Sequence, residues 1–289
     1  TVYNCSVRNN GDDGLAMWND ETMGAMDEKN NTFAYNTIEL IWRAGGIAIY
    51  GGDGHKIYNN YIADMFMASG IHLNDVFPGP KYTNTQKISF DNNILVRCGT
   101  NNDSWHEDLA AIDIKGGVRN VVFNNTKIYD SPFDAIRVMS GPTGIEFKNT
   151  EILGASLAGQ TTKYSTWEHS TGAIRLDVDG VKFSNGIKIA NVSEDKIKNN
   201  QTWPVWTDNN KSRAAAIGYE YLSDATYKVP DFPKADTSQQ GGIVNPLEGI
   251  KGYDIALQGL RWENAEGNTS LKEGDDVTFK FALQNVSNV

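Results

Sequence analysis

Short apolar phrases separated by polar residues recur along the first 190 residues. One phrase sets an apolar residue two places before an Asn and another apolar residue shortly after it, as in VYNCSV, IYNNYI and FDNNIL. Its Asn residues are spaced by 32, 23, 33, 33, 24 and 36 positions: Asn4, Asn36, Asn59, Asn92, Asn125, Asn149 and Asn185. The shortest spacings match one coil of a parallel β-helix, and the longer ones match a coil with an inserted loop of roughly ten residues.

A second phrase keeps the same period and predicts the strands of one face. It occurs as GLAMWN, GIAIYG, GIHLND, AIDIKG, AIRVMS and AIRLDV. Because side chains alternate along a strand, its aliphatic residues point inward and two columns point outward. These columns are Ala16, Ala48, His72, Asp113, Arg137 and Arg175, then Trp18, Tyr50, Asn74, Lys115, Met139 and Asp177. With coils about 4.8 Å apart, the outward strip is about 24 Å long and fits several sugar rings.

The two phrases agree in period and together predict an all-β protein. We expect a right-handed parallel β-helix of the pectin-lyase-like kind over residues 1–190. The alternative is an antiparallel sandwich or barrel, but Asn-Gly and Asp-Gly hairpin signals between paired runs are sparse. The chain opens without Met and inside a strand-like alternation, so we expect it to be a piece of a longer protein.

The later part of the chain loses the repeat. Pro, Gly and polar residues dominate 191–252, which predicts a cap and linker. The strand, turn, strand pattern of 253–289 resembles the start of an immunoglobulin-like β-sandwich module. It is shorter than the ~100 residues of a whole sandwich.

Charge and cysteine content exclude several functions. A net charge of −10 and a pI near 4.9 argue against nucleic acid and anionic membranes as partners and are compatible with a neutral glycan. No apolar run approaches the ~18 residues of a membrane span. Cys5 and Cys98 are too few for a disulfide framework, and no His/Cys/Glu cluster implies zinc. We expect a monomer without a cofactor, calcium at Asp20-Glu21 being the one candidate metal site.

Asp12 and Asp13 are the candidate catalytic pair. They precede Gly14 in the turn that leads to the outward strip, and no later coil carries a double acid there. With Trp18 nearby, the pair offers acid and base groups beside a surface on which a sugar ring can stack. Repulsion between the charges raises one pKa, so that one carboxyl can stay protonated near neutral pH. Asp is also common in turns, so the dipeptide alone favours a structural role, whereas its position at the head of an aromatic, polar groove favours a catalytic one.

Several other residues are candidates for substrate binding. They are Trp18, Tyr50, His72, Asn74, Asp75 and Asp53. Asp53 and Asp75 lie near strand ends, where they line subsites or serve as solvated turn residues. Trp42 and Trp105 lie in predicted insertions, where a tryptophan either stacks on a sugar or covers the core.

The first coils also resemble a known family. VRNNGDDGLAMWND, GGIAIYGGDGHKIYNNYIAD and SGIHL are similar to the catalytic β-helix of the bacterial α-1,3-glucanases and mycodextranases, glycoside hydrolase family 87. The similarity is dense over residues 1–75 and looser to about 190. GDDGLAMW followed by IAIYGG carries it, whereas GDD alone also occurs in pectin-degrading β-helix enzymes.

This resemblance implies a secreted, extracellular, endo-acting hydrolase of α-glucan polysaccharides such as mutan and nigeran. It places Asp12 and Asp13 among the catalytic acids and a further essential Asp about one coil upstream, before Thr1. The implied reaction inverts the anomeric centre, which requires two carboxyls about 6.5–9.5 Å apart. One of Asp12 and Asp13 is then the general acid, and the other, or the upstream Asp, activates water.

Two other functions also fit the sequence. A pectinase-type hydrolase acts on acidic polymers and needs cations near its acids; the available ones are Arg43, Lys115, Arg137 and Arg175. A non-catalytic β-helix adhesin or glycan-binding module would bind along the same strip without cleaving.

Overall fold

The computed structural model describes residues 1–20, 22, 28–78, 82–102, 105, 107–157, 173–178, 180–192, 219–222, 226–231, 255–264 and 277–285. The chain divides into two compact units, Thr1–Pro233 and Lys234–Val289, and each is described by itself. Within the described ranges, no helix is long and apolar enough to cross a membrane.

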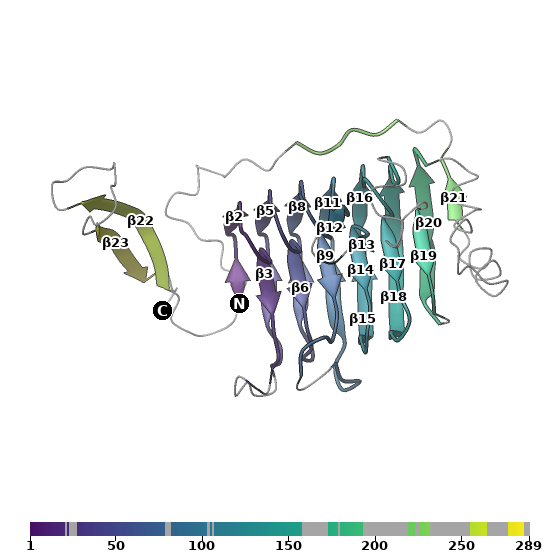
Figure 1. Ribbon diagram of the computed structural model, residues 1–289, viewed down its shortest axis with the longest axis horizontal. Helices are drawn as coiled ribbons and strands as arrows, with labels where there is room; N and C mark the ends of the chain where they lie inside the picture. Colours follow the sequence, from purple (N-terminus) through teal and green to yellow (C-terminus); the bar gives the residue numbers. More distant parts are fainter. Residues whose placement is uncertain are drawn as a thin grey trace. The chain divides into compact units, whose positions relative to one another are not determined.

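The first unit is a parallel β-helix with three rows of strands (Figure 1). The first row contains β1 (Val2–Tyr3), β4 (Thr32–Ala34), β7 (Lys56–Tyr58), β10 (Ile88–Asp91), β15 (Arg119–Asn124) and the start of β18 (Thr143–Leu153). The second row contains β2 (Ser6–Arg8), β5 (Thr37–Glu39), β8 (Tyr61–Ala63), β11 (Ile94–Val96), β16 (Lys127–Tyr129) and the end of β18. Beyond β18, both rows continue through β20 (Lys182–Ala190), which also pairs with β21 (Tyr219–Tyr221).

The third row is a separate sheet of six parallel strands. Its members are β3 (Leu15–Met17), β6 (Ile47–Ile49), β9 (Ile71–Leu73), β14 (Ile112–Ile114), β17 (Ile136–Val138) and β19 (Ile174–Leu176). A short antiparallel pair, β12 (Asn101–Asn102) and β13 (Glu107–Asp108), lies in the insertion before β14. The predicted all-β parallel β-helix is confirmed.

Stacked apolar side chains fill the β-helix. Of the predicted inward residues of the third row, Leu15 is partly buried and the others are buried, with Ile47, Ile71 and Ile112 each 0% exposed. In the first row, the rings of Phe90, Phe123 and Phe147 stack with centroids 4.6 and 4.7 Å apart. Each fully buried side chain of this kind stabilises the fold by roughly 1.5–3 kcal/mol. The apolar repeat therefore keeps successive coils in register, while hydrogen bonds between the parallel strands set their spacing.

Two neighbouring columns of Asn form the turn between the first and second rows. One column has left-handed backbone, with φ between 50° and 55° at Asn4, Asn59, Asn92, Asn125 and Asn149. Asn36 was predicted in this column, but Tyr35 occupies it with φ 56°. Asn36 lies in the adjacent buried column, where its Nδ2 donates to Asn60 Oδ1 at 3.0 Å. The prediction failed there because this turn has one Asn, and the buried position with its hydrogen bonds takes it.

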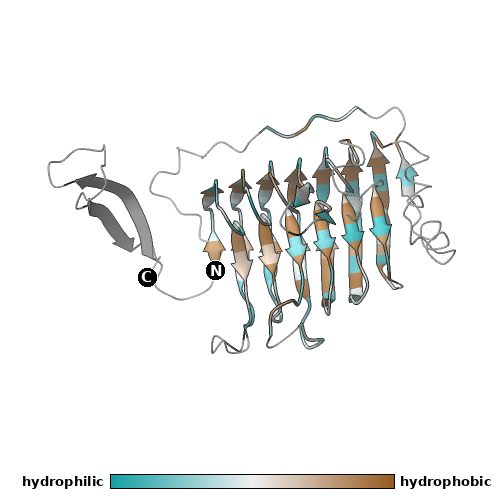
Figure 2. Cartoon of the chain, viewed as in Figure 1, coloured by the Kyte–Doolittle hydropathy of each residue, from teal (hydrophilic) through white to brown (hydrophobic). Residues whose placement is uncertain are grey.

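The outward strip has the predicted register but is not open along its length. Ala48, His72, Asp113 and Arg137 pair in sequence across adjacent strands. His72, Asp113 and Arg137 are only 3%, 0% and 1% exposed, so the expected 24 Å surface is wrong. Insertions and ion pairs cover these polar residues. Figure 2 shows hydrophilic colour in β9, β14, β17 and β19, whereas β3 and β6 lack it.

The described residues of the second unit form an antiparallel pair, β22 (Ile255–Asn264) and β23 (Val277–Asn285). The immunoglobulin-like identity of 253–289 and the boundaries at 190 and 252 stay predictions. Most of 191–252 lies outside the described residues, although β21 falls within it and extends the first unit's sheet.

Candidate active site

A cavity of about 700 Å³ lies over the first coils of the third row. Its walls come from strand ends and from the insertions that follow them. The lining residues are Asp12, Asp13, Ala16, Trp18, Arg43, Ala44, Tyr50, His72, Asn74, Val76, Phe77, Trp105, Glu107 and Lys115. The cavity thus brings together both predicted acids and four of the six predicted binding residues.

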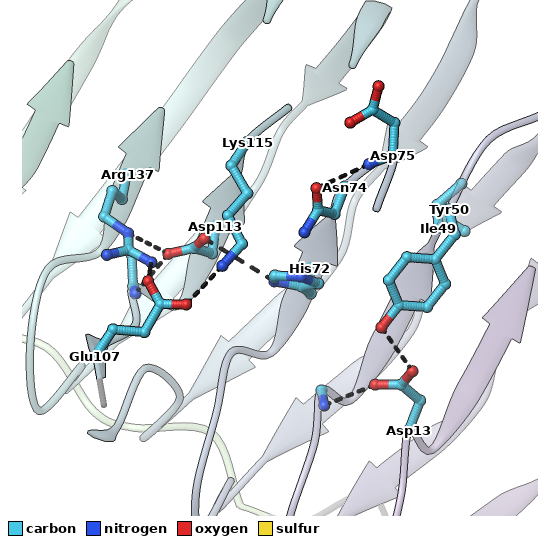
Figure 3. Close-up of polar contacts among 12 residues, drawn as sticks. Asp13, Ile49, Tyr50, His72, Asn74, Asp75, Glu107, Asp113, Lys115 and Arg137 are labelled. Atoms are coloured by element: carbon cyan, nitrogen blue, oxygen red, sulfur yellow. Dashed lines mark hydrogen bonds and ion pairs between the residues drawn. The ribbon is translucent and has the colours of Figure 1, made fainter. Parts of the chain in front are cut away.

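Asp13 is held by hydrogen bonds to both of its carboxylate oxygens (Figure 3). The Gly45 N–H donates to Oδ1 at 2.8 Å, and the Tyr50 hydroxyl donates to Oδ2 at 2.9 Å. Gly45 sits one coil along in the same column, and a β-carbon built there would lie 3.3 Å from Asp13 Oδ1. A glycine at that position therefore lets the carboxylate approach the backbone. The residues at the two ends of β6, on one neighbouring coil, therefore fix the orientation of Asp13.

Burial raises the pKa of Asp13 to about 6. The hydrogen bonds from Tyr50 and Gly45 oppose this rise, and the negative charge of Asp12 adds to it. Repulsion within the pair was expected to be the cause, but it is a smaller contribution than desolvation, because Asp12 is exposed to water. Asp13 therefore changes its charge near pH 6.

Asp12 lies at the rim of the cavity. Its side chain is 69% exposed, its Oδ1 accepts the N–H of Asp13 at 3.0 Å, and its Oδ2 lies 3.4 Å from Arg43 Nη2. The two adjacent carboxyls therefore occupy different environments, one exposed to water and one buried and held by two hydrogen bonds.

Aromatic rings line the wall beside the acids. Phe77 lies 4.9 Å, centroid to centroid, from both Trp18 and Tyr50. Trp18 is 47% exposed, which leaves part of the indole available for stacking. Trp105 covers His72 with a centroid distance of 5.8 Å. Phe77 was not a sequence candidate, because it lies in an insertion outside both repeated phrases.

A chain of ion pairs closes the far end of the cavity (Figure 3). Lys115 Nζ lies 2.5 Å from Glu107 Oε1, and Glu107 Oε2 lies 3.0 Å from Arg137 Nη2. Arg137 Nε in turn lies 2.5 Å from Asp113 Oδ2. Two cations and two carboxylates thus balance within this group. Glu107 was missed by sequence analysis, since its insertion carries no repeat.

His72 stands between the acids and this ion-pair chain. Its burial lowers the imidazole pKa to about 4, so the ring is neutral at neutral pH. Nδ1 lies 3.9 Å from Asp113 Oδ1, beyond hydrogen-bond distance. A neutral imidazole at a cavity wall is suited to hydrogen bonding with a hydroxyl group.

Comparison with known proteins assigns the fold to a family. The profile of the family described as "Right handed beta helix region" matches residues 1–152. The chain belongs to this right-handed β-helix family. No curated protein matches it.

Solved structures similar to this β-helix include catalytic domains. The Agl-KA catalytic domain is 38% identical with a TM-score of 0.55, over 64% of this chain and 32% of that one. A GH87 α-1,3-glucanase catalytic domain with tetrasaccharides is 17% identical with a TM-score of 0.47, over 64% and 39%. The chain therefore spans about a third of the Agl-KA domain, and this match confirms the sequence resemblance to a catalytic β-helix.

Two predicted binding residues of the β-helix lie outside the cavity lining. Asp53 is 2% exposed, and its Oδ1 accepts the N–H of Gln86 at 2.9 Å, so it ties down the start of β10. Asp75 follows Asn74 in the turn after β9 and packs beside Gly117. Asn74 itself lines the cavity. Trp42, 51% exposed, lies over Gly11 next to Asp12.

The described residues contain no group of three or more His, Cys, Asp or Glu side chains placed to hold a metal. At the candidate calcium position, Asp20 Oδ1 accepts from the Thr22 hydroxyl at 2.6 Å. Glu21, its predicted companion, lies outside the described residues. The expectation of a cofactor-free protein stays a prediction.

Proposed function

We propose that this chain is part of a secreted, endo-acting glycoside hydrolase that cleaves α-1,3-glucosidic bonds of α-glucan with inversion. The observation that carries the proposal is Asp13, a buried carboxyl with a pKa near 6 that is oriented by two hydrogen bonds and adjoins a second acid at an aromatic cavity. The similarity to the Agl-KA catalytic domain supports catalysis. The GDDGLAMW and IAIYGG motifs, which resemble family 87, support the substrate class.

In the proposed reaction, Asp13 is the base that activates water. Donors to both carboxylate oxygens favour its ionised form, and a pKa near 6 gives a base of suitable strength at neutral pH. Asp12, on the open side, donates its proton to the departing glycosidic oxygen once the bound glycan covers this carboxyl and excludes water from it. Water attacks the anomeric carbon as that C–O bond breaks, so the configuration inverts. The upstream Asp implied by the resemblance would assist the same water.

Substrate binding would use the walls around this pair. Trp18 offers a partly exposed ring face for a glucosyl unit. His72 and Asn74 offer neutral polar groups at the floor of the cavity, where sugar hydroxyls need hydrogen-bond partners. Tyr50 serves mainly to hold Asp13, because its hydroxyl donates to that carboxylate.

The charges of the cavity disfavour an acidic polymer as substrate. Arg43 lies near Asp12, Lys115 pairs with Glu107, and Arg137 pairs with Asp113 and Glu107. Each cation that a pectinase would direct at a uronate thus has an internal carboxylate beside it. A neutral glucan faces no such mismatch.

The test is hydrolysis of insoluble α-1,3-glucan, nigeran, polygalacturonate and dextran by the full-length protein, followed through released reducing sugar. We expect soluble products from the α-1,3-linked glucans and a loss of at least about 10³-fold in Asp13→Asn. Asp64→Asn is the matched control, because Asp64 pairs with Arg97 in a left-handed turn of another row, a conformation that Asn tolerates. Sedimentation with glucan without release would instead indicate a binding module.

A further inference from the structure

Glu107 occupies an unusual position among the charges of the cavity. Its carboxylate is bonded on both sides by cations, Lys115 at Oε1 and Arg137 at Oε2. Arg137 has a second acid, Asp113, at 2.5 Å from Nε. For Lys115, by contrast, Glu107 is the carboxylate that pairs with it among the described residues. Removing the charge of Glu107 would therefore affect Lys115 most.

Both members of the Lys115–Glu107 pair reach the cavity. Each lines its wall, and their side chains are 23% and 15% exposed, whereas Arg137 is 1% exposed behind them. The ammonium of Lys115 also lies 5.8 Å from the ring centroid of Trp105, so the lysine stands beside an aromatic surface. An aromatic face next to an ammonium is a favourable place for an anionic sugar, provided that the ammonium is free.

We propose that Glu107 is a specificity-determining residue that makes the cavity selective for neutral over anionic sugars. Its carboxylate neutralises Lys115 and completes the charge balance around Arg137, so a uronate entering this end meets an anion and no free cation. A neutral hydroxyl meets no such repulsion. The inference deepens the proposed function, because it assumes that this cavity receives a glycan chain.

The experiment compares binding of oligogalacturonates and nigero-oligosaccharides by calorimetry, using the full chain. In Glu107→Gln the Lys115 ammonium is released, and we expect galacturonate to bind about tenfold more tightly at low salt. The gain should shrink at about 0.15 M salt, where the Debye length is about 8 Å. Adding Lys115→Met to Glu107→Gln should abolish the gain, which assigns it to that ammonium.

Glu151→Gln is the matched control. Glu151 pairs with Lys127 at 3.5 Å on the second row, outside the cavity lining, so its loss should leave galacturonate binding unchanged. Thermal unfolding of each variant checks folding, and Glu107→Met provides a second uncharged replacement. If a folded Glu107 variant gains no affinity, or if neither variant folds, the proposal is refuted.

The design separates this proposal from the proposed function. Nigero-oligosaccharide binding by the unmodified chain tests the glucan cavity, independently of Glu107. If the unmodified chain binds nigero-oligosaccharides but Glu107→Gln gains nothing for galacturonate, only the role of Glu107 is refuted. If the unmodified chain binds galacturonate and not nigero-oligosaccharides, the neutral-glucan function itself is refuted.

Discussion

The two ends of the cavity hold carboxylates in opposite ways. Burial acts to raise the pKa of both Asp13 and Asp113. At Asp113 the guanidinium of Arg137 outweighs burial and the pKa falls. The hydrogen bonds to Asp13 come from neutral groups and Arg43 contributes least, so the pKa of Asp13 rises to about 6. The comparison shows that burial creates a reactive acid only where no buried cation compensates for it. One end can exchange a proton near neutral pH, and the other is a fixed ionic wall.

The largest effect is expected at the end of the cavity where Arg137 compensates for the burial of Asp113. Arg137→Leu leaves Asp113 buried without its main partner, which should lower the free energy of unfolding by about 3–5 kcal/mol. Urea unfolding of the first unit measures this loss. Arg97→Leu is the control, because Arg97 and Asp64 form an exposed pair whose loss should cost about 0–1 kcal/mol. Equal losses in the two variants would show that Asp113 depends on Arg137 no more than an exposed carboxylate depends on its ion-pair partner.

A smaller and opposite effect is expected at Asp13. Because folding raises its pKa above the unfolded value, Asp13 favours the folded state fully below about pH 4, and this contribution is lost as pH rises through 6. Asp13→Asn removes that loss and should stabilise the protein by about 1–2 kcal/mol above pH 6, allowing for partial exposure. Melting temperatures of both proteins from pH 4 to 8 measure the difference. A constant difference across this range would contradict the raised pKa.

Tyr50→Phe removes the hydrogen bond that partly offsets the effect of burial on the pKa of Asp13. The Tyr50 hydroxyl lowers the pKa of Asp13, so its removal should raise that pKa further and move the rising limb of the pH–rate profile to higher pH. Near pH 6 we expect hydrolysis to fall severalfold, consistent with one hydrogen bond of about 1 kcal/mol. A fall in rate without movement of the limb would assign Tyr50 to substrate contact alone.

The sequence predicted the positions of these residues along the strands better than it predicted their burial. Alternation placed His72, Asp113 and Arg137 in one column, because register in a β-helix follows directly from the apolar repeat. It could not predict their burial, which depends on the insertion that carries Trp105 and Glu107. Insertions lack the repeat, so nothing in the pattern places their side chains.

The candidate acids illustrate the same limit. Position in the repeat put Asp12 and Asp13 at the mouth of the third row, and both line the cavity. The raised pKa of Asp13 is caused mainly by burial, and the presence of Asp12 next to it in the sequence does not predict that burial. Asp53 has the same residue type near another strand end, yet it ties a backbone amide inside a turn. Residue type near a strand end was too weak a signal to separate these roles.

The smallest effect is expected at Gly45, which lies between Asp13 and His72. A β-carbon there would lie 3.3 Å from Asp13 Oδ1 and 3.4 Å from His72 Cβ, so Gly45→Ala presses on both with slightly tight contacts. We expect a loss of stability below about 1 kcal/mol and a severalfold loss of hydrolysis, because the carboxylate must shift by a fraction of an ångström. Gly46→Ala is the contrasting variant, since its β-carbon would meet Gly70 O at 2.7 Å and should destabilise the coil instead. Thermal unfolding and hydrolysis measured on both variants separate the two effects. Full activity in Gly45→Ala would mean that Asp13 tolerates displacement, and its orientation by Gly45 would then be unimportant for catalysis.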